Sequence, residues 1–534
     1  MEFQSVKLDY AATKSFAAFV DRYQKHDAAI APYITAFASI STLKEQARKK
    51  SFSAEKRKNL AATWRKQYEY IEGCELQLAA IAMLEQENCF TLTTGHQCGL
   101  FAGPMYLIYK IISVINLAKE MNAVDAEKHY LPVFWMATED HDFAEINHIN
   151  LLTKRITLNS EQEGNAVGRI TLTDVESCLQ EIEELVQHFP YGKDAIEKLR
   201  KAYQSNHNIS FATRTFIHEL FKEDGLLILD ADDASLKKEA STIFAKELES
   251  TENTELVERH TQDLIQAGIL AKAQINARNT NLFLFESNKR KRIDRVDNGF
   301  AIKDMEQVKS LEEMLRIAKE ESMTISPNVL LRPLYQESIL PNICYIGGGA
   351  EVMYWLQIQP LFSKYQVPFP ILMLRNSALI LEKNPLDKFH SLGFELHDIF
   401  EKQAALQASY LAKHVETITL QAEIQQLESL FAELKKKVAE LDKTLEASTE
   451  SEASKNIASM RNLEQKIARA QKRKEETSLS QIEKFKSKYF PEEALQERFD
   501  NFLYFYSKYG NEFLNILKEQ FHPLENKFDV LILD

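Results

Sequence analysis

The sequence predicts an α/β protein: a parallel sheet covered by helices on both faces, interrupted by insertions and followed by an antiparallel helical arm. Two observations carry this prediction. Continuous apolar runs such as 130–136 alternate with helical patterns, which is typical of buried parallel strands. From Leu420 onward, apolar residues recur at alternating intervals of four and three, which indicates the seam of a coiled coil.

Composition narrows the class of protein. At 534 residues the chain exceeds the size at which single cores stop growing, so we expect two or more structural units. A net charge of −13 argues against a general nucleic-acid binder. No apolar run approaches the roughly 18 residues that span a bilayer, and the first residues lack a signal-peptide pattern. Five cysteines without a CxxC pair fit reduced thiols, so we expect a cytoplasmic protein.

The sheet is predicted from its strands in chain order. The first eighty-odd residues are interpreted as helices, because apolar side chains recur there at helical spacing. A strand at 90–94, a helix at 104–120 and a strand at 130–136 then begin the sheet. Strands at 342–346 and 370–374 resume it.

The residues between, from about 150 to 325, are interpreted as one or more insertions into the core. The basic run 289–292 is interpreted as a solvated hairpin. The elements expected within the insertions are a strand at 169–172, a helix at 211–222, a strand at 226–229 and a hairpin from 281–285 to 300–302.

The helical arm is predicted as an antiparallel hairpin. Its seam runs from Leu420 to Leu445, the polar stretch 447–452 interrupts it, and a second helix follows from Ile457. Two helices sharing so narrow a seam leave apolar surface, which we expect to meet the body or another subunit. A strand at 528–533 is expected to return to the core. Five segments are predicted. Residues 1–150 hold the first helices and the first half of the core, residues 151–325 are the insertions, and residues 326–390 hold the second half of the core. Residues 391–505 form the arm, and residues 506–534 return to the core.

A glycine-rich loop is the first candidate site. Gly95, Gly99 and Gly103 stand within nine positions of a chain that has only 15 glycines, between a predicted strand and a helix that Pro104 fits as a first-turn residue. That order presents backbone N–H groups to an anion, beside His96 and Gln97. The spacing matches neither familiar nucleotide fingerprint, and close helix packing is the alternative explanation.

An acidic cluster closes the next predicted strand. Glu139, Asp140, His141 and Asp142 are followed by Glu145, Asn147 and His148. Carboxylates around an imidazole can hold a metal, act as general acid or base, or bind a substrate amine. The alternative is a solvated acidic turn in which His141 is salt-bridged.

A third constellation follows the strand at 342–346. Gly347 and Gly348 precede Glu351, which lies in the first turn of a predicted helix and could simply complement its dipole. Arg332 and Arg375 flank this region and are candidates for phosphate or carboxylate contacts, although a lone arginine is often structural. A nucleophilic pair of Cys98 with His96 is a further alternative, and Cys344 is expected to be a buried strand residue.

Together these motifs resemble a known family, the cysteine-adding enzymes of bacillithiol biosynthesis. The resemblance rests on segments that follow one another along the predicted core, and the heptad arm falls where that family carries its coiled coil. It implies a Rossmann-like core with connecting-peptide insertions, and a homodimer formed through the coiled coil. The segments are 94–106, 132–143, 331–333, 345–355 and 374–377.

The resemblance also implies a reaction that joins the carboxylate of cysteine to the amine of glucosaminyl malate. Activation of the carboxylate makes ATP the expected co-substrate, and no metal-ligand set is identified. The loop 95–103 would cradle phosphate, with His96 and Gln97 donating hydrogen bonds to developing charge. The cluster 139–142 would hold the cysteine ammonium or deprotonate the attacking amine, and Arg332 or Arg375 would hold the malate carboxylates. The other candidate binding residues are Thr94, Gly95, Gly99, Gly103, Asn147, Gly347, Gly348, Glu351 and Tyr354.

Two other classes of protein remain open at this stage. One is a metal-dependent hydrolase that uses the cluster 139–142 together with His148. The other is a non-catalytic scaffold whose coiled coil recruits further proteins. Metal analysis separates the first from a ligase, and nucleotide binding without turnover would indicate the second.

Overall fold

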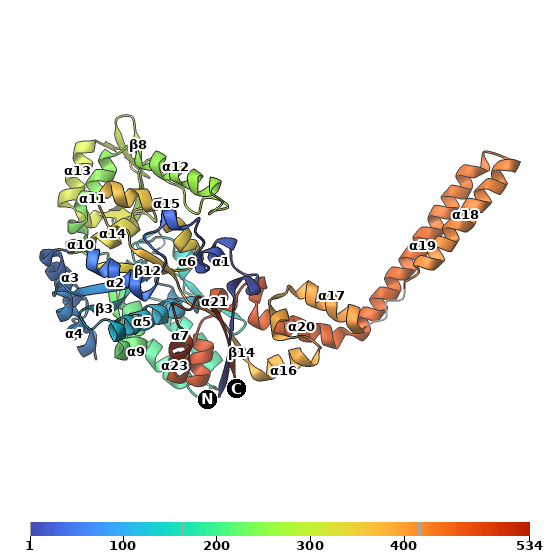
Figure 1. Cartoon of the computed structure of the whole chain (residues 1–534), viewed down its shortest axis with the longest axis horizontal. Coiled ribbons are helices and arrows are strands. Elements are labelled where there is room, and N and C mark those ends of the chain that lie inside the picture. The colour runs from blue at the N-terminus through green and yellow to red at the C-terminus, as the bar shows by residue number, and fades with distance from the viewer. Residues whose placement is uncertain (1, 163, 415–418) are drawn as a thin grey trace. The chain divides into compact units, whose positions relative to one another are not determined.

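The computed structural model describes residues 2–162, 164–414 and 419–534 (Figure 1). The chain divides into two compact units, each of which is described separately. The first comprises residues 1–380 and 496–531, and the second comprises residues 381–495 and 532–534. No helix among the described residues is long and apolar enough to cross a membrane.

The centre of the first unit is a five-stranded sheet in which every neighbouring pair is parallel. Its central strands are buried along nearly their whole length, as the apolar runs in the sequence predict for a sheet covered on both faces. The predicted parallel sheet is therefore confirmed. In spatial order its strands are β13 (Ile371–Leu374), β12 (Asn342–Gly347), β2 (Cys89–His96), β3 (His129–Met136) and β6 (Leu227–Asp230).

The strand order reverses direction between β2 and β12. From β2 the chain adds β3 and then β6 on one side, and it later adds β12 and β13 on the other side. Helix α5 (Tyr106–Val124) connects β2 to β3, and helix α15 (Gly349–Tyr365) connects β12 to β13. In open sheets of this kind, ligands bind beyond the carboxyl ends of the strands at such a reversal. The topology therefore directs attention to the ends of β2 and β12.

The amino-terminal region is helical, as predicted, except for one strand that was missed. Strand β1 (Phe3–Leu8) joins β15 (Phe528–Leu533) and β14 (Ser377–Glu382) in a three-stranded sheet. It is an edge strand with polar, exposed side chains, so its apolar signal is weak. The strand predicted at 528–533 is confirmed. The helices are α1 (Ala18–Gln24), α2 (Ile40–Lys49), α3 (Ala54–Gln67) and α4 (Glu75–Leu84).

The region predicted as insertions contributes one strand to the core, because β6 is the edge strand of the parallel sheet. The strand predicted at 169–172 is wrong. Val167–Arg169 form a 3₁₀ turn, and Thr171 makes only an isolated bridge with Asn208. Outside the two larger sheets, the helices and strands between β3 and β12 are α6 (Phe143–Ile146), β4 (His148–Leu151), β5 (Lys154–Thr157), α7 (Val175–Val186), α8 (Gly192–Ala202), α9 (Ile209–Phe221), α10 (Ala234–Glu239), α11 (Ser241–Glu249), α12 (Asn253–Gln266), α13 (Leu311–Glu320) and α14 (Arg332–Ile339).

A second five-stranded sheet, entirely antiparallel, replaces the single hairpin predicted at 281–302. The basic run 289–292 begins its third strand and lies in an antiparallel hairpin, as predicted, but it is only partly solvated. Within this strand Arg290 is buried, while Lys289 and Arg292 are exposed. In spatial order the strands are β10 (Val308–Lys309), β9 (Gly299–Ile302), β8 (Lys289–Val296), β7 (Leu282–Glu286) and β11 (Ile325–Pro327).

The second unit contains the predicted antiparallel hairpin, in which α18 (Gln421–Leu441) and α19 (Leu445–Lys474) lie side by side (Figure 1). The turn was predicted at 447–452, but it lies at 442–444. There the carboxylate of Asp442 accepts hydrogen bonds of 2.8 Å from both the N–H and the hydroxyl of Thr444. The remaining helices of the chain are α16 (Lys383–Ser391), α17 (Gln403–His414), α20 (Glu476–Tyr489), α21 (Gln496–Phe499), α22 (Leu503–Tyr509) and α23 (Asn511–Gln520).

Candidate functional site

A cavity of about 740 Å³ opens at the carboxyl ends of β2, β3 and β12, where the strand order reverses. Gly95, His96 and Gln97 line it from the end of β2. Segment 140–142, which directly follows β3, lines it as well, and Glu351 does so from the first turn of α15. Three segments that are far apart in the sequence therefore meet at one site, because parallel strands end at the same edge of a sheet.

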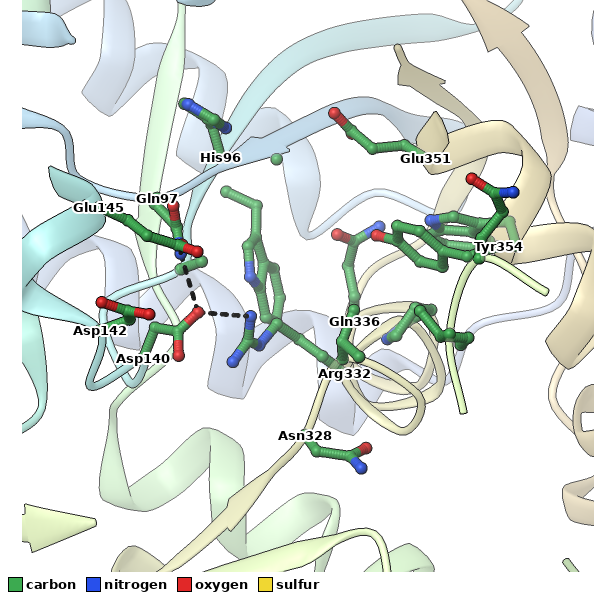
Figure 2. Close-up of a pocket in the computed structure, with 18 of the residues that line it drawn as sticks. His96, Gln97, Asp140, Asp142, Glu145, Asn328, Arg332, Gln336, Glu351 and Tyr354 are labelled. Atoms are coloured by element: carbon green, nitrogen blue, oxygen red, sulfur yellow. Dashed lines mark hydrogen bonds and ion pairs between the residues drawn. The ribbon is translucent and has the colours of Figure 1, made fainter. Parts of the chain in front are cut away.

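Acidic side chains gather on one side of the cavity (Figure 2). The amide nitrogen of Gln97 donates hydrogen bonds of 3.0 Å to both Asp140 and Glu145, which holds these two carboxylates together. Burial alone would raise the pKa of Asp140. His141, Arg332, Arg290 and Gln97 outweigh burial, so its pKa lies well below the usual range and Asp140 is ionised at neutral pH.

Arg290 fixes the position of this acidic group. Its Nη1 lies 3.3 Å from Asp140 Oδ1 and 3.3 Å from His141 Nδ1, and its other nitrogens donate to Ser326 and to the carbonyl of Pro327. A guanidinium can only donate, so Nδ1 of His141 is the acceptor in this contact.

Asp142 differs from its neighbours in the cluster. It lines the cavity and is exposed, and among the described residues its side chain makes no ion pair or hydrogen bond. A free carboxylate at this place can receive an ammonium group or a proton from a ligand.

Two guanidinium groups line the cavity without a side-chain hydrogen bond to an anion among the described residues. Arg332 begins α14, and its Nη1 is 3.9 Å from Asp140 Oδ2, too far for a hydrogen bond (Figure 2). Arg278 lies in an irregular segment and makes no side-chain ion pair among the residues that the structure describes. Sequence reasoning identified Arg332 but missed Arg278, because nothing in its local pattern marks it.

The opposite side of the cavity is built around Glu351, with Tyr354 beside it (Figure 2). Both Glu351 oxygens accept hydrogen bonds from the ammonium of Lys110, at 2.7 and 2.8 Å, and Oε2 also accepts one of 2.8 Å from the hydroxyl of Tyr345. Lys110 is fully buried in α5 and was not predicted. Its ammonium carries a third hydrogen bond to the carbonyl of Gly95.

His96 lies between these two sides and is neutral. Its pKa is lowered well below the usual value, first by burial and then by the positive charges of Lys110 and Arg375. The ring packs edge-on against Tyr106. A neutral imidazole keeps one N–H, so the predicted role of His96 as a donor to developing charge stays consistent with its surroundings.

Nine of the predicted site residues line this cavity and eight do not. The nine are Gly95, His96, Gln97, Asp140, His141, Asp142, Arg332, Glu351 and Tyr354. The eight outside its lining are Thr94, Gly99, Gly103, Glu139, Asn147, Gly347, Gly348 and Arg375.

Internal partners explain why two predicted charged residues lie elsewhere. Arg375 forms a two-pronged ion pair with buried Glu497, at 2.7 and 3.1 Å, so its guanidinium is already occupied. Glu139 is buried and pairs with Lys237 at 2.7 Å. The cluster 139–142 is therefore divided, with Glu139 turned to the interior and the other three residues at the cavity.

The glycine loop also divides. A Cβ on Gly99 would lie 2.9 Å from the Cα of Gly103, so close backbone packing explains these two glycines. Helix α5 begins at Tyr106, two residues after Pro104, and the N–H of Met105 donates to the carbonyl of Asp500. The start of this helix does not line the cavity, and of the predicted phosphate cradle only residues 95–97 do.

The remaining predicted residues have structural contacts. Thr94 donates a 2.8 Å hydrogen bond to the carbonyl of Ile346, which links β2 to β12. The carbonyl of Asn147 accepts from the N–H of Leu158. Among the described residues, no group of three or more His, Cys, Asp or Glu side chains is arranged to hold a metal ion.

Comparison with known proteins agrees with this architecture. Residues 1–376 match the N-terminal Rossmann-like domain of the bacillithiol biosynthesis protein BshC, and residues 378–533 match its C-terminal coiled-coil domain. Curated relatives named "Putative cysteine ligase BshC" align over nearly the whole chain. One from Flavobacterium psychrophilum is 36% identical over 93% of both chains. One from Flavobacterium johnsoniae is 33% identical over 98% of this chain and 99% of its own. One from Christiangramia forsetii is 34% identical over 98% of both chains.

Proposed function

The chain belongs to the BshC family of bacillithiol biosynthesis, and from that membership we propose that it is a ligase that joins cysteine to the amine of glucosaminyl malate. The reaction forms a carbon–nitrogen amide bond. One observation carries the proposal beyond family membership: a single cavity, at the reversal of strand order, presents free carboxylate and free guanidinium groups to a ligand. Both substrates combine amino and carboxylate groups, so both need that mixture.

The acidic side of the cavity suits the amino groups. This side carries the negative charge of three carboxylates, those of Asp140, Asp142 and Glu145. Gln97 holds the first and the last of them in place. An ammonium group is attracted to such a site, and a free carboxylate there can accept the proton that an amine releases as it attacks the acyl carbon. Both N–H groups of the Gln97 amide are used in this arrangement, so Gln97 orients the carboxylates and His96 remains the donor toward the reacting carbonyl.

Arg332 and Arg278 suit the two carboxylates of malate. A guanidinium binds a carboxylate through two parallel hydrogen bonds, and among the described residues neither of these two arginines makes a side-chain hydrogen bond to an anion. Arg278 takes the place that the sequence had suggested for Arg375. The proposed malate site therefore contains Arg332, as the sequence suggested, and Arg278 in place of Arg375.

ATP is the proposed source of activation, because a free carboxylate does not react with an amine at a useful rate. An oxygen of the cysteine carboxylate would bond to the α-phosphorus of ATP while the bond to pyrophosphate breaks, which gives an acyl-adenylate and free pyrophosphate. The amine of the sugar then attacks the acyl carbon, a carbon–nitrogen bond forms, and the bond to AMP breaks with its electron pair leaving on phosphate oxygen. We assign the amine proton to Asp142, the free carboxylate of the cluster.

We also propose that the protein is a homodimer formed through its helical hairpin and that it works in the cytoplasm. Leu430, Leu434 and Leu441 lie on one face of α18 and are 51%, 38% and 84% exposed, an apolar stripe that a second copy would cover. All five cysteines are unpaired, as a reducing compartment favours.

The test is a reconstituted reaction. Purified protein is incubated with cysteine, glucosaminyl malate and each nucleoside triphosphate in turn, and all products are identified by mass. We expect a product with the mass of both substrates less one water, together with AMP and pyrophosphate. Asp142→Asn should lower kcat by about 100-fold, as loss of a general base does. Ser160→Ala, a polar change outside the cavity, is the control. Full turnover by the Asp142 variant would remove Asp142 from the mechanism, and no amide product from the wild type would reject the ligase.

A further inference from the structure

Lys110 is a buried cation that the proposed reaction does not use. Its side chain is 0% exposed and does not line the cavity, yet it contacts two segments that do. The ammonium has three protons, and all three are donated: two to Glu351 and one to the carbonyl of Gly95. Lys110 therefore bridges the end of β2 and the start of α15 across the reversal of strand order.

The contacts of Glu351 leave it with little free capacity. An ionised carboxylate has about four acceptor positions. Lys110 occupies one on each oxygen and the hydroxyl of Tyr345 occupies a second on Oε2. One position remains, on Oε1. Because Glu351 is 25% exposed and lines the cavity, that position is available to a ligand.

The charge of this pair decides what kind of ligand group it accepts. Glu351 and Lys110 together carry no net charge. The negative charge of Glu351 is already neutralised, so an ammonium group placed there would be repelled by Lys110 with no free anion to attract it. A hydroxyl group donates one hydrogen bond and brings no charge. The acidic side of the cavity, with three carboxylates, is the better place for an ammonium.

The surrounding side chains favour a ring that carries hydroxyl groups. Tyr345, Tyr354 and Trp355 line the cavity with Glu351, and the rings of Tyr345 and Trp355 stack with centroids 4.3 Å apart. Tyr345 and Trp355 are buried and stack on each other, so of these three rings only the half-buried Tyr354 is open to a ligand. A carboxylate that accepts from a ribose hydroxyl is also a recurring device in nucleotide-binding sheets of this type.

We propose that Lys110 is a positioning residue that holds Glu351 so that its one free acceptor position receives a hydroxyl group of a sugar ring. The inference rests on the proposed function, which supplies two compounds with such hydroxyls: the ribose of ATP and the glucosamine ring of the acceptor. Lys110 acts only through Glu351 and the end of β2. Its loss therefore removes the recognition of one hydroxyl group and leaves the other ligand contacts in place.

The experiment measures discrimination, because a general weakening of the fold does not change a ratio of affinities. Calorimetry gives the Kd of ATP and of its 2′-deoxy and 3′-deoxy forms in one arm. The other arm uses glucosaminyl malate and its deoxy-sugar analogues. In the wild type we expect removal of one hydroxyl, in one arm only, to weaken binding on the order of tenfold, as loss of a hydrogen bond to a charged group does.

Variants then test whether the preference for the parent compound over its deoxy form depends on the Lys110–Glu351 pair. In Lys110→Met the ratio between parent and deoxy compound should fall to about one. The double variant K110M/E351A, which leaves no unpaired buried charge, should fold and show the same loss. Lys237→Met is the matched control, since Lys237 is also fully buried and pairs with Glu139 and Asp232 outside the cavity. It should keep the wild-type ratio whatever its stability.

A wild-type ratio in the double variant overturns the inference, and so does an active wild type that discriminates against no deoxy compound in either arm. These outcomes differ from failure of the proposed function. A wild type that makes no amide product but still discriminates against one deoxy compound contradicts the ligation reaction and leaves the role of Lys110 and Glu351 supported.

Discussion

At the scale of single residues, burial decides which charges do chemistry and which hold the structure. Arg290 and Arg292 stand two positions apart in a basic run that looks uniform in sequence. The first is buried against Phe283 and Asp140, and the second is exposed and pairs with Asp294. Residues two apart lie on the same face of a strand, so the pleat does not separate these two arginines. The difference comes from what packs over each of them, which the sequence does not show.

We predict that Arg290→Met destabilises the protein by about 3 kcal/mol, because it leaves the ionised Asp140 without its buried partner. Urea unfolding gives the free energy. Removal of this cation also removes one of the charges that depress the pKa of Asp140. Asp140 should therefore gain a proton at a higher pH than in the wild type.

The matched control for that prediction is Arg292→Met, on the same strand but exposed, which we expect to change stability by no more than about 0.5 kcal/mol. Equal destabilisation by the two variants would contradict the assignment of Arg290 as the buried member of the run.

A second residue-scale prediction concerns Asp529 in β15. Burial raises its pKa to about 7, and one of its oxygens has no hydrogen-bond partner among the described residues. The folded state therefore binds a proton that the unfolded state has lost between about pH 4 and 7, so stability falls as the pH rises through this window. Asp529→Asn should raise the free energy of unfolding by on the order of 2–4 kcal/mol at pH 8.

The pH dependence of that gain is the check. In thermal or urea unfolding the advantage of Asp529→Asn should shrink as the pH is lowered toward 4, where aspartate is protonated in both states. A gain of the same size at pH 8 and pH 4.5 would show that it does not arise from ionisation.

At the scale of elements, the predictable features are those that repeat. The apolar strands and the heptad seam each extend over many residues, and both predictions were confirmed. Predictions that depended on a few residues were wrong. The turn of the arm was misplaced because Asp442 and Thr444 form it with one side-chain carboxylate, whereas 447–452 continues as helix. The edge strand β1 was missed because its exposed positions are polar.

The exposed stripe on α18 gives an element-scale prediction. Replacing Leu430, Leu434 and Leu441 together by Lys should convert the proposed homodimer to a monomer, because apolar surface that a partner would cover becomes charged. Light scattering after size-exclusion chromatography measures the mass. The hairpin should stay helical, since Ile424, the buried member of the predicted seam, is unchanged.

A control for that experiment reverses two exposed charges on the same helix, Glu428→Lys and Lys436→Glu, and should leave the mass unchanged. A monomeric wild type, or a dimer that survives the three leucine changes, would reject the proposal that this stripe is the dimer interface.

At the scale of the whole molecule, the sequence predicted the sheet and the edge at which the cavity opens, because both follow from the order of strands and helices. It could not predict partners that come from distant segments. Lys110, Arg278 and Arg290 reach the cavity or its supporting contacts from a helix, an irregular segment and a second sheet. Their positions depend on packing between elements, and no local pattern encodes it.

The central claim is that ligation takes place in the cavity at the ends of β2, β3 and β12. The most direct measurement is a crystal structure with a stable sulfamoyl analogue of cysteinyl-adenylate. The account predicts the analogue in this cavity, with its ammonium against Asp140 and Asp142. Binding of the analogue at any other place, with the cavity left free, would contradict the account.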